Sequence, residues 1–323
     1  PGNQQHIQSL TKAGVFGFKA FLTHSGIDDF PNVSESDLRM AIPEIKKSGL
    51  PLLVHAELES SHADQDLLEN NPFSYAAYLK SRPKQWEDNA IQLMINLCKE
   101  FKQHTHIVHL SSSNSIAQLT KAIDNGLPIS VETCPHYLFF NAEEIGDGQT
   151  QFKCAPPIRE RANNDALWKA VKDGLISFIV TDHSPAPPDL KELETGNFKK
   201  AWGGIAGLEF SLPAFWTKAK DKGFTLVDVA SLMSTNVARF LGLENQKGKI
   251  AKGFDADMVV WHPEKKFRVN KDEITFRHKI TPFEDQLLYG LVERTYVGGQ
   301  KVFEDEKFHQ LNGGRILTRK YNG

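Results

Sequence analysis

Four polar residues of this chain have side chains that could together bind metal ions: Lys19, His55, His109 and Asp182. Neutral imidazole and carboxylate groups are ligands that Zn²⁺, Mn²⁺ and Fe²⁺ accept. A protonated lysine repels such ions, but a desolvated lysine can lose its proton. The neutral amine can then add CO₂ to become a carbamate that bridges two ions. Two ions about 3.5–4 Å apart polarise a carbonyl and activate water, and Asp182 could carry the proton to a leaving nitrogen.

The spacing of apolar residues places these side chains in a repeated pattern of strands and helices. Five short apolar runs are typical of strands that are buried on both faces, as in a parallel sheet. They cover residues 15–22, 50–57, 106–110, 128–134 and 176–180. Helical segments alternate with them, over 34–47, 73–79, 86–101, a stretch ending near 125, a stretch ending near 173, 208–220 and 227–241. The alternation predicts right-handed βαβ units and therefore a parallel sheet.

Chemistry in parallel α/β folds takes place at the carboxyl ends of the strands. The first run carries Lys19, the second and third end in His55 and His109, and Asp182 follows the fifth. Each alone has a simpler interpretation. Asp182 could cap a helix, Lys19 could extend to solvent, and a histidine at a strand end is commonly a hydrogen-bonded core residue. Their equivalent positions in successive units favour one shared site.

Other polar residues are weaker candidates. His104 and His106 have the H-x-H spacing of a metal site, but they precede the apolar part of their strand and are expected at the opposite end of the sheet. His183 could lie beside the ligands or be exposed. The backbone of Gly203 and Gly204 could approach a ligand closely, or these glycines could form a plain turn before a helix.

Two further segments have open interpretations. His136 and Tyr137, which follow the fourth strand, could line a pocket or pack a loop. Arg159, beside a rigid Pro-Pro loop, could meet an anionic substrate. A structural or solvated ion pair is the favoured interpretation of Arg159.

The composition excludes several classes of protein. The 323 residues include 38 basic and 40 acidic side chains, with a formal net charge of −2 and no long run of one sign. Nothing therefore favours nucleic acid or a charged membrane surface as a partner. Cys98, Cys134 and Cys154 form no CxxC pair, which indicates a reduced, intracellular protein, cytoplasmic by default, with a mitochondrial or peroxisomal address left open. No apolar run approaches the ~20 residues that span a bilayer.

The four candidate ligands lie in motifs that resemble those of the amidohydrolase superfamily, specifically the cyclic-amide hydrolases. The motifs are GFK at 17–19, VHAE at 54–57, VHLS at 108–111 and TDHSP at 181–185. Within that group, VETCPHY at 131–137, FKCAPPIR at 152–159 and WGGIAG at 202–207 are most similar to the allantoinases. GFDAD at 253–257 extends the resemblance into a C-terminal part in which short β runs, such as 256–261 and 295–303, alternate with Gly and Asp turns.

The resemblance implies an α/β fold, a (β/α)₈ TIM-type barrel of the metal-dependent amidohydrolases with a small C-terminal β appendage. It implies two divalent metal ions, Zn²⁺ first and Mn²⁺, Fe²⁺ or Co²⁺ as alternatives. It also implies a role for each residue. N6-carboxylysine at Lys19 would bridge the two ions, and His55 and His109 would bind one of them. Asp182 would bind the other ion and act as the base. The implied reaction is the hydrolytic ring opening of allantoin to allantoate in purine catabolism.

The resemblance also implies Cys154 and Ser184 as substrate contacts, a small cyclic ureide as substrate, and a homotetramer. Two alternatives stay open. The first is another cyclic amidohydrolase, namely a dihydropyrimidinase, hydantoinase or dihydroorotase, against which the loop at 154–159 and Ser184 favour allantoinase. The second is a non-catalytic scaffold with the same fold, against which the retention of all four ligand residues argues.

The chain departs from the family pattern near its start. The family's first barrel strand supplies an H-x-H pair to one metal, whereas the residues before Lys19 contain one histidine, His6, in no such motif. The five predicted strands are therefore expected to be the fourth to eighth of the barrel. Residues 1–247 would be an incomplete barrel and residues 248–323 would hold part of a small β-sandwich domain. We expect this stretch alone to be inactive and to hold at most a single metal ion.

Overall fold

The five predicted strands are present in the computed structural model, which describes residues 1–60, 63–309 and 314–319. They are β1 (Phe18–Phe21), β2 (Leu52–His55), β3 (Thr105–Ile107), β4 (Ile129–Thr133) and β5 (Phe178–Ile179). All neighbouring pairs are parallel, and the order in the sheet is the order in the chain. The predicted α/β fold is confirmed, and each strand is shorter than its apolar run.

The strand residues explain why the sheet forms where it does. Val54, Ile107 and Val131 are fully or almost fully buried, because strands of a parallel sheet have helices on one face and packed side chains on the other. The register places Phe21 beside His55 and Leu52 beside Thr105. Neighbouring strands therefore end at one edge, and the loops that follow them are brought together there.

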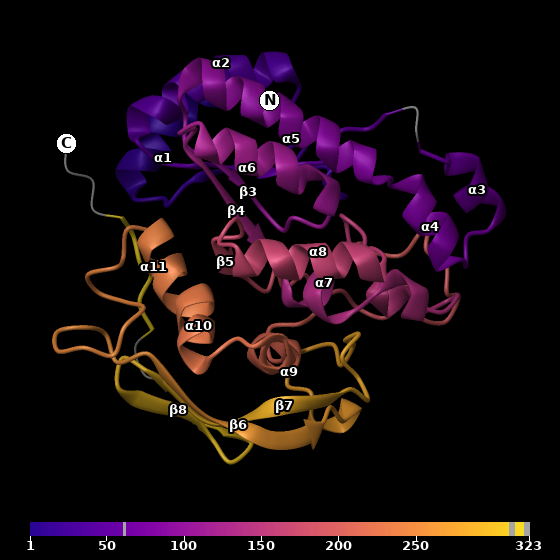
Figure 1. The fold of residues 1–323 in the computed structure, drawn as a ribbon, viewed down its shortest axis with the longest axis vertical. Coiled ribbons are helices and arrows are strands. Elements are labelled where there is room, and N and C mark those ends of the chain that lie inside the picture. Colours follow the sequence, from indigo (N-terminus) through magenta and orange to yellow (C-terminus); the bar gives the residue numbers. More distant parts are fainter. Residues whose placement is uncertain (61–62, 310–313, 320–323) are drawn as a thin grey trace. The chain divides into compact units, whose positions relative to one another are not determined.

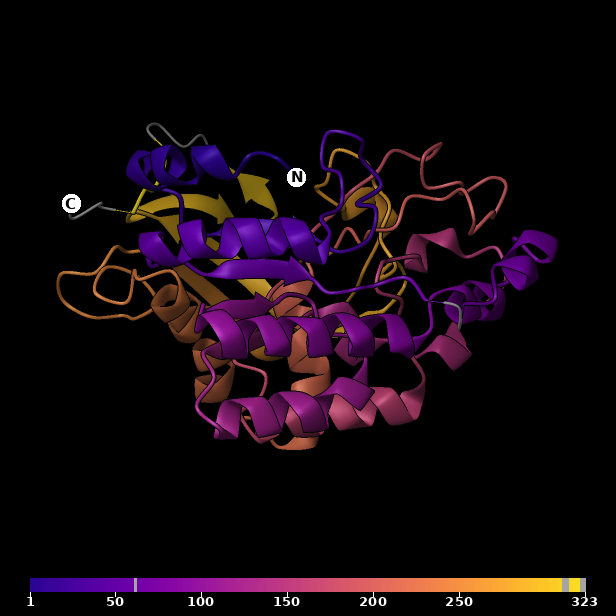
Figure 2. The same cartoon turned by 90° about the horizontal axis from the view of Figure 1, so that it is seen from above.

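Helices follow the strands in the first unit, which consists of Pro1–Ala206 and a short C-terminal piece that begins at Thr318. They are α1 (Ile7–Ala13), α2 (Glu35–Ser48), α3 (Gln65–Asn70), α4 (Tyr75–Ser81), α5 (Lys84–Phe101), α6 (Ile116–Asp124), α7 (Pro135–Phe139) and α8 (Arg161–Lys172), with 3₁₀ turns at Gln4–His6, Ser113–Ser115, Ala142–Glu144 and Thr150–Phe152. Helices α2, α5 and α6 lie side by side in the order of their strands (Figures 1 and 2).

A capping box stabilises the start of α2. The Asp37 backbone N–H donates to Ser34 Oγ at 3.2 Å, and the Ser34 N–H donates to Asp37 Oδ2 at 2.9 Å. The two bonds satisfy N–H groups that a helix start otherwise leaves without partners. Helices α1, α3 and α7, which have seven, six and five residues, were not predicted.

The second unit, Gly207–Leu317, contains an antiparallel sheet. Its strands are β6 (Met258–Arg268), β7 (Leu287–Val297), β8 (Gln300–Glu304) and β9 (Lys307–Phe308), in that order. Its helices are α9 (Ser211–Ala219), α10 (Leu226–Ala230) and α11 (Asn236–Phe240), with a π turn at Ser231–Thr235 and 3₁₀ turns at Lys220–Lys222 and Lys271–Glu273. Helix α9 packs on β7, where the Tyr289 N–H donates to Thr217 Oγ1 at 2.8 Å.

The second unit was predicted to contain a β run at 295–303 and to begin after residue 247. The run predicted at 295–303 is two strands, because Gly298 and Gly299 adopt positive φ angles of 55° and 80° and turn the chain between β7 and β8. Such a glycine pair suits the two-residue hairpin turns whose twist matches that of the strands. The domain boundary expected after residue 247 stays a prediction. The contacts within the chain group α9–α11 with the antiparallel sheet.

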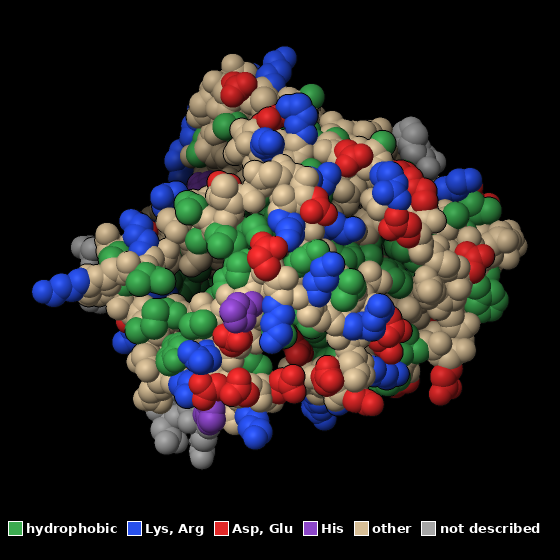
Figure 3. All heavy atoms as spheres, turned by 60° about the horizontal axis from the view of Figure 1, so that its bottom comes forward, with side chains coloured by type: hydrophobic (Ala, Val, Ile, Leu, Met, Phe, Trp, Pro, Cys, Tyr) green, Lys and Arg blue, Asp and Glu red, His purple; other side chains and the backbone are tan. Residues whose placement is uncertain are grey.

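The surface agrees with the near-zero net charge. Basic and acidic side chains are interspersed with apolar ones on the face that Figure 3 shows. In the ranges that the structure describes, no helix has both the length and the apolar character needed to cross a membrane.

Candidate active site

A cavity of about 940 Å³ in the first unit is lined by all four predicted ligands, Lys19, His55, His109 and Asp182. Lys19 lies within β1, His55 is the last residue of β2, and the other two follow β3 and β5 closely. The parallel register brings these strand ends to one edge, as predicted. The structure thus assembles the four residues, and their roles as ligands stay a prediction.

The aromatic rings at the site are in contact. The His55 and His109 rings lie edge to face with their centroids 4.6 Å apart, and the Phe21 ring lies 5.3 Å from that of His55. Lys19 Nζ is 5.1 Å from the centroid of the Phe21 ring. These contacts limit the rotation of both imidazoles and hold the lysine amine near them.

Two of the four residues have strained backbone. His109 and Asp182 have φ angles of 41° and 45°, in the left-handed region that residues other than glycine seldom adopt. Such strain persists only where the surroundings hold the backbone in place, and it clusters at functional sites. The alternative that Asp182 caps a helix is excluded. No helix begins between Asp182 and α9 at Ser211, a stretch that the structure describes throughout.

The His55 ring is held by a buried carboxylate. His55 Nε2 is 2.8 Å from Glu57 Oε2, and Arg82 donates from Nε and Nη2 to the two oxygens of Glu57 at 3.1 and 2.5 Å. Burial acts to raise the pKa of Glu57, but the Arg82 guanidinium and His55 outweigh it, so that this pKa lies well below its usual range. Glu57 is therefore an ionised acceptor.

His109 has a neutral imidazole. Burial, together with the charges of His55 and Lys19, holds the pKa of His109 well below its ordinary value. Its Nδ1 atom is buried and has no hydrogen-bond partner among the described residues. Because a buried polar atom is almost always paired, this nitrogen is the observation that points most directly to a missing ligand.

Lys19 and Asp182 both line the cavity, and the charge of each one affects the pKa of the other. Both side chains are open to solvent there, yet the surrounding protein favours their neutral forms. Burial lowers the pKa of the Lys19 amine, with the Asp182 and Glu132 carboxylates opposing that change. Burial raises the pKa of Asp182, opposed by the Lys19 ammonium. A lysine that loses its proton more readily is the form that carbamate formation requires.

The donor types fit a divalent metal ion, but their number does not complete a site. Among the described residues, no three His, Cys, Asp or Glu side chains lie close enough together to hold a metal ion. The predicted ligands that line the cavity are two imidazoles, one carboxylate and Lys19, and an unmodified Lys19 contributes a cation where a ligand is expected. Carboxylation would replace that charge with two oxygen ligands, so we conclude that the residues present fit the metal in chemistry.

The two predicted substrate contacts differ in placement. Ser184 lines the cavity, and its Oγ accepts a hydrogen bond from Trp202 Nε1 at 3.0 Å. Cys154 is buried and is not among the described residues that line the cavity. Its carbonyl accepts from the Tyr78 hydroxyl at 2.6 Å, and burial raises the pKa of the Cys154 thiol to about 12. Its thiol therefore stays protonated at neutral pH.

The weaker candidates are structural. Arg159 is buried and pairs with Glu87 at 3.0 Å, which confirms the favoured ion-pair interpretation. The Tyr137 hydroxyl donates to the Pro156 carbonyl at 2.7 Å. His136 is buried against the Tyr137 ring, with the centroids 4.2 Å apart. Both residues therefore pack a loop.

The other candidate histidines, His104, His106 and His183, are not among the residues that line the cavity. His104 and His106 bind Ser130 Oγ at 2.9 and 2.7 Å, and His106 also binds Glu132 at 3.0 Å. His183 is half-buried in a parallel β-bridge with Ile205. Of the two glycines, Gly203 lines the cavity, whereas Gly204 packs against Ser184, because a Cβ on Gly204 would lie 2.4 Å from Ser184 Oγ.

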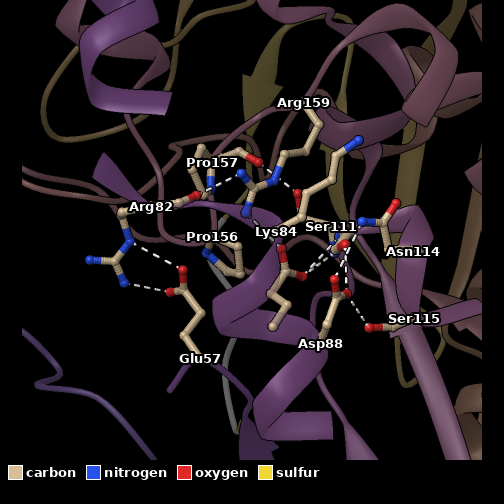
Figure 4. A network of polar contacts seen from close by, with 12 residues as sticks. Glu57, Arg82, Lys84, Asp88, Ser111, Asn114, Ser115, Pro156, Pro157 and Arg159 are labelled. Carbon is tan, nitrogen blue, oxygen red and sulfur yellow. Dashed lines mark hydrogen bonds and ion pairs between the residues drawn. The ribbon is translucent and has the colours of Figure 1, made fainter. Parts of the chain in front are cut away.

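Several polar residues beside the predicted ligands were missed from the sequence. Glu57 and Glu87 are buried and pair with Arg82 and Arg159, and Arg82 itself lines the cavity. Figure 4 shows Glu57, Arg82 and Arg159 of this network. One signal was available: Glu57 follows His55 by two residues, and side chains at that spacing share one face of an extended segment. Arg82 and Arg159 could not be assigned as partners of Glu57 and Glu87. They lie 25 and 72 residues away from these carboxylates in the sequence, and such a distance leaves no local pattern.

Comparisons with known proteins agree with this architecture. A family model described as the amidohydrolase family matches residues 12–302. An allantoinase of Streptomyces avermitilis is 43% identical over 320 residues, which are 99% of this chain and 70% of that protein. An allantoinase of Arabidopsis thaliana is 43% identical over 94% of this chain and 62% of its own length. For an allantoinase of Saccharomyces cerevisiae the values are 39%, 94% and 66%.

Solved structures give the same fold. An L-hydantoinase (dihydropyrimidinase) from Arthrobacter aurescens has a TM-score of 0.88 and 29% identity, over 96% of this chain and 69% of that one. A D-hydantoinase (dihydropyrimidinase) from a Thermus species has a TM-score of 0.89 over 99% of this chain and 71% of that one, and at 24% identity it supports the fold alone. The chain spans about two thirds of the length of these relatives.

Proposed function

This chain belongs to the amidohydrolase family, and on that premise we propose that the protein containing it is an allantoinase, which hydrolyses a ring amide of allantoin to give allantoate. The observation that carries the proposal is the meeting of Lys19, His55, His109 and Asp182 in one cavity. The allantoinases are 39–43% identical to this chain, whereas the hydantoinases of known structure are 29% and 24% identical. Allantoin is therefore preferred over hydantoin as the substrate.

The metal ligands in this proposal are Lys19 as its carbamate, His55, His109 and Asp182. When bound, divalent ions polarise a carbonyl and lower the pKa of water. We include Zn²⁺ as the metal, with Mn²⁺, Fe²⁺ or Co²⁺ as alternatives, because imidazole and carboxylate suit all of them. The lowered pKa of Lys19 and the unpaired Nδ1 of His109 support this assignment.

Asp182 would move the proton. The oxygen of water adds to the carbonyl carbon of the ring amide while the water proton passes to the Asp182 carboxylate. The C–N bond then breaks, and Asp182 returns the proton to the leaving nitrogen, which gives a free N–H and a carboxylic acid. The acid ionises to the carboxylate by releasing its proton to solvent. The position of Asp182 at the cavity wall supports this role.

Ser184 would orient the ring. Its hydroxyl accepts from Trp202 Nε1 and still has its own proton to donate. That proton can meet a carbonyl oxygen of a ureide. Because the indole fixes the oxygen of Ser184, the direction of the remaining O–H bond is restricted, which favours one substrate orientation.

The proposal also covers the oligomeric state and the cellular location of the protein. A homotetramer is expected from the family resemblance and is checked by light scattering on the purified protein. An intracellular location is supported by the three cysteines, all of which are free and buried, and is checked by cell fractionation.

The test is hydrolysis of allantoin, hydantoin and dihydrouracil by the purified protein that contains this sequence, with its metal content measured in parallel. We expect metal-dependent hydrolysis of allantoin with a higher kcat/KM than for the other two rings. Faster hydrolysis of hydantoin or dihydrouracil would mean that this ring, and not allantoin, is the preferred substrate. Bound metal without hydrolysis of any of the three rings would favour the non-catalytic scaffold.

A further inference from the structure

Two ion pairs with buried carboxylates contact the segments that carry the two histidines of the cavity. They are Glu57–Arg82 and Glu87–Arg159, and we call these four residues the buried frame (Figure 4). We propose that the buried frame positions His55 and His109, by selecting the tautomer of the first ring and holding the backbone turn of the second. The inference rests on the proposed function for its consequence in catalysis.

The first pair determines which nitrogen of His55 carries the proton. Glu57 is fully buried, and its oxygens accept from Arg82 Nε and Nη2 and from His55 Nε2. An ionised carboxylate can only accept, so Nε2 must be the donor. In the neutral ring the lone pair then resides on Nδ1. A carboxylate partner of this kind fixes the tautomer and orientation of an imidazole that binds a metal through its other nitrogen.

The second pair holds the backbone that follows His109. Glu87 Oε1 accepts from the N–H groups of Ser111 and Ser112 at 3.0 and 2.9 Å, and Glu87 Oε2 accepts from Arg159 Nη2 at 3.0 Å. His109 has the strained φ of 41° just before this segment. A carboxylate bound to two successive N–H groups fixes a turn with charge-assisted hydrogen bonds. It thereby supplies the outside constraint that a strained residue needs.

The two pairs are joined into one unit. Arg159 Nη1 donates to the Arg82 carbonyl at 2.6 Å, which connects the partner of Glu57 to the partner of Glu87. The Ser111 hydroxyl donates to the Pro157 carbonyl at 2.6 Å, so the loop that carries Arg159 is tied to the segment after His109. The two pairs are therefore parts of one hydrogen-bond network.

Stability alone is a poor explanation for this arrangement. Buried ion pairs cost desolvation free energy that apolar residues of similar volume do not incur. Arg159 Nε is also buried without a hydrogen-bond partner among the residues described, which adds a further cost. The arrangement is better explained by the precise contacts that it makes to the two histidine segments.

The test uses three variants of the complete protein. Glu57→Gln and Glu87→Gln each remove one frame carboxylate at almost constant volume. Glu100→Gln is the matched control, because Glu100 also binds an arginine through both oxygens (Arg39 Nη1, 2.8 Å to each) but is exposed on the surface. The first measurement is the tautomer of His55 by NMR of ¹⁵N-labelled histidine in metal-free protein.

We expect His55 in the wild type and in Glu100→Gln to be protonated at Nε2. In Glu57→Gln the ring should lose this single tautomer, since an amide can donate as well as accept. Glu87→Gln should shift the His109 resonances and leave the His55 tautomer unchanged. A single Nε2–H tautomer in Glu57→Gln, or unchanged His109 resonances in Glu87→Gln, would overturn the proposal.

The second measurement is the rate at which the Co²⁺-loaded protein loses its metal to a chelator, followed by visible absorption. Loss of a carboxylate behind a ligating histidine typically weakens metal affinity about 10–100-fold. We expect both frame variants to lose Co²⁺ faster by a factor in this range, and Glu100→Gln to match the wild type. Equal rates in all four proteins, with a lower Tm in the frame variants, would show a purely structural role.

Neither measurement requires allantoin, so the buried frame and the proposed function can fail separately. A frame-dependent tautomer in a protein that does not hydrolyse allantoin would overturn the function and support the frame. If Glu57→Gln does not fold, the double variant Glu57→Gln/Arg82→Met replaces it, because it removes both charges of the pair and leaves neither of them buried alone. An unchanged single Nε2–H tautomer of His55 in the double variant would overturn the proposal.

Discussion

His55 and His109 lie edge to face, with ring centroids 4.6 Å apart and ring planes inclined at 69°. They come from the ends of the neighbouring strands β2 and β3. Glu57 binds the His55 ring, whereas Glu87 binds the backbone of Ser111, two residues after His109. Since each ring forms part of the wall against which the other packs, the two histidines should respond to substitution as a pair.

The first prediction concerns Asp182. Asp182→Asn should lower kcat for allantoin about 10²–10⁴-fold, because the amide cannot take up a proton, and this is the usual contribution of general acid–base catalysis. The KM should change far less. Steady-state kinetics measure both values. Asp189→Asn is the control, since Asp189 is exposed and lies outside the residues that line the cavity. A kcat for Asp182→Asn near that of the wild type would contradict the assignment.

The second prediction concerns the carbamate of Lys19. Metal-free protein prepared in buffer depleted of CO₂ should bind Zn²⁺ poorly and should bind it well once bicarbonate is added, because the bridging oxygens come from CO₂. Isothermal titration with and without bicarbonate measures the difference. Lys19→Gln should show no response to bicarbonate. Equal Zn²⁺ affinity in both buffers for the wild type would mean that Lys19 is not carboxylated.

The third prediction concerns the contact between Gly204 and Ser184. A Cβ at Gly204 would lie 2.4 Å from Ser184 Oγ and 2.8 Å from the Ser184 carbonyl oxygen. Gly204→Ala should therefore lower the free energy of unfolding by about 1–3 kcal/mol and raise the KM for allantoin, because Ser184 must move.

The neighbouring glycine is the control for this variant. A Cβ at Gly203 would meet Ala155 Cβ at 3.6 Å, an ordinary contact. Gly203→Ala should change the unfolding free energy by no more than about 0.5 kcal/mol. Urea unfolding measures both proteins, and equal losses in the two would show that the close approach of Gly204 to Ser184 has no energetic consequence.

The fourth prediction concerns Lys191, a buried lysine that donates to three carbonyls. Its Nζ lies 2.8, 2.9 and 2.7 Å from the carbonyl oxygens of Lys153, Trp202 and Gly204. Burial lowers the pKa of Lys191 from the ordinary 10.5 to about 7, and the charge of Lys153 adds to the effect. Below pH 7 the amine is protonated in both folded and unfolded chains, and folding bears the full cost of burying the charge.

The sign of the pH effect follows from proton binding. Between about pH 7 and 10.5 the unfolded chain binds a proton that the folded chain has lost, so the free energy of unfolding rises with pH. Relative to Lys191→Met, the wild type should gain on the order of 2 kcal/mol between about pH 7 and about pH 9. Urea unfolding of both proteins measures this, and Lys200→Met, an exposed lysine variant, is the control. A constant difference would show that Lys191 keeps its proton.

Local sequence patterns predicted the outline of the site. Runs of apolar residues separated by helical segments indicate parallel βαβ units, and in a parallel sheet the strand ends must meet at one edge. That rule was enough to select Lys19, His55, His109 and Asp182 from all the polar residues, and the structure places all four around one cavity. The capping box of Ser34 and Asp37 was also predictable, because both partners lie within one turn of helix.

Tertiary structure decided the features that depend on distant partners. The predicted strand at 106–110 included His109, but strand β3 ends at Ile107. His109 therefore lies outside the strand, in a left-handed conformation that Glu87 stabilises through the next residues. Glu57 and Arg82 are 25 residues apart, and Glu87 and Arg159 are 72 apart. Periodicity reports only on neighbours within a few residues, so a pairing over such distances leaves no signal in one sequence. The sequence by itself therefore determined which residues reach the cavity, and only the packed fold decided how they are oriented and which tautomer and backbone conformation they adopt.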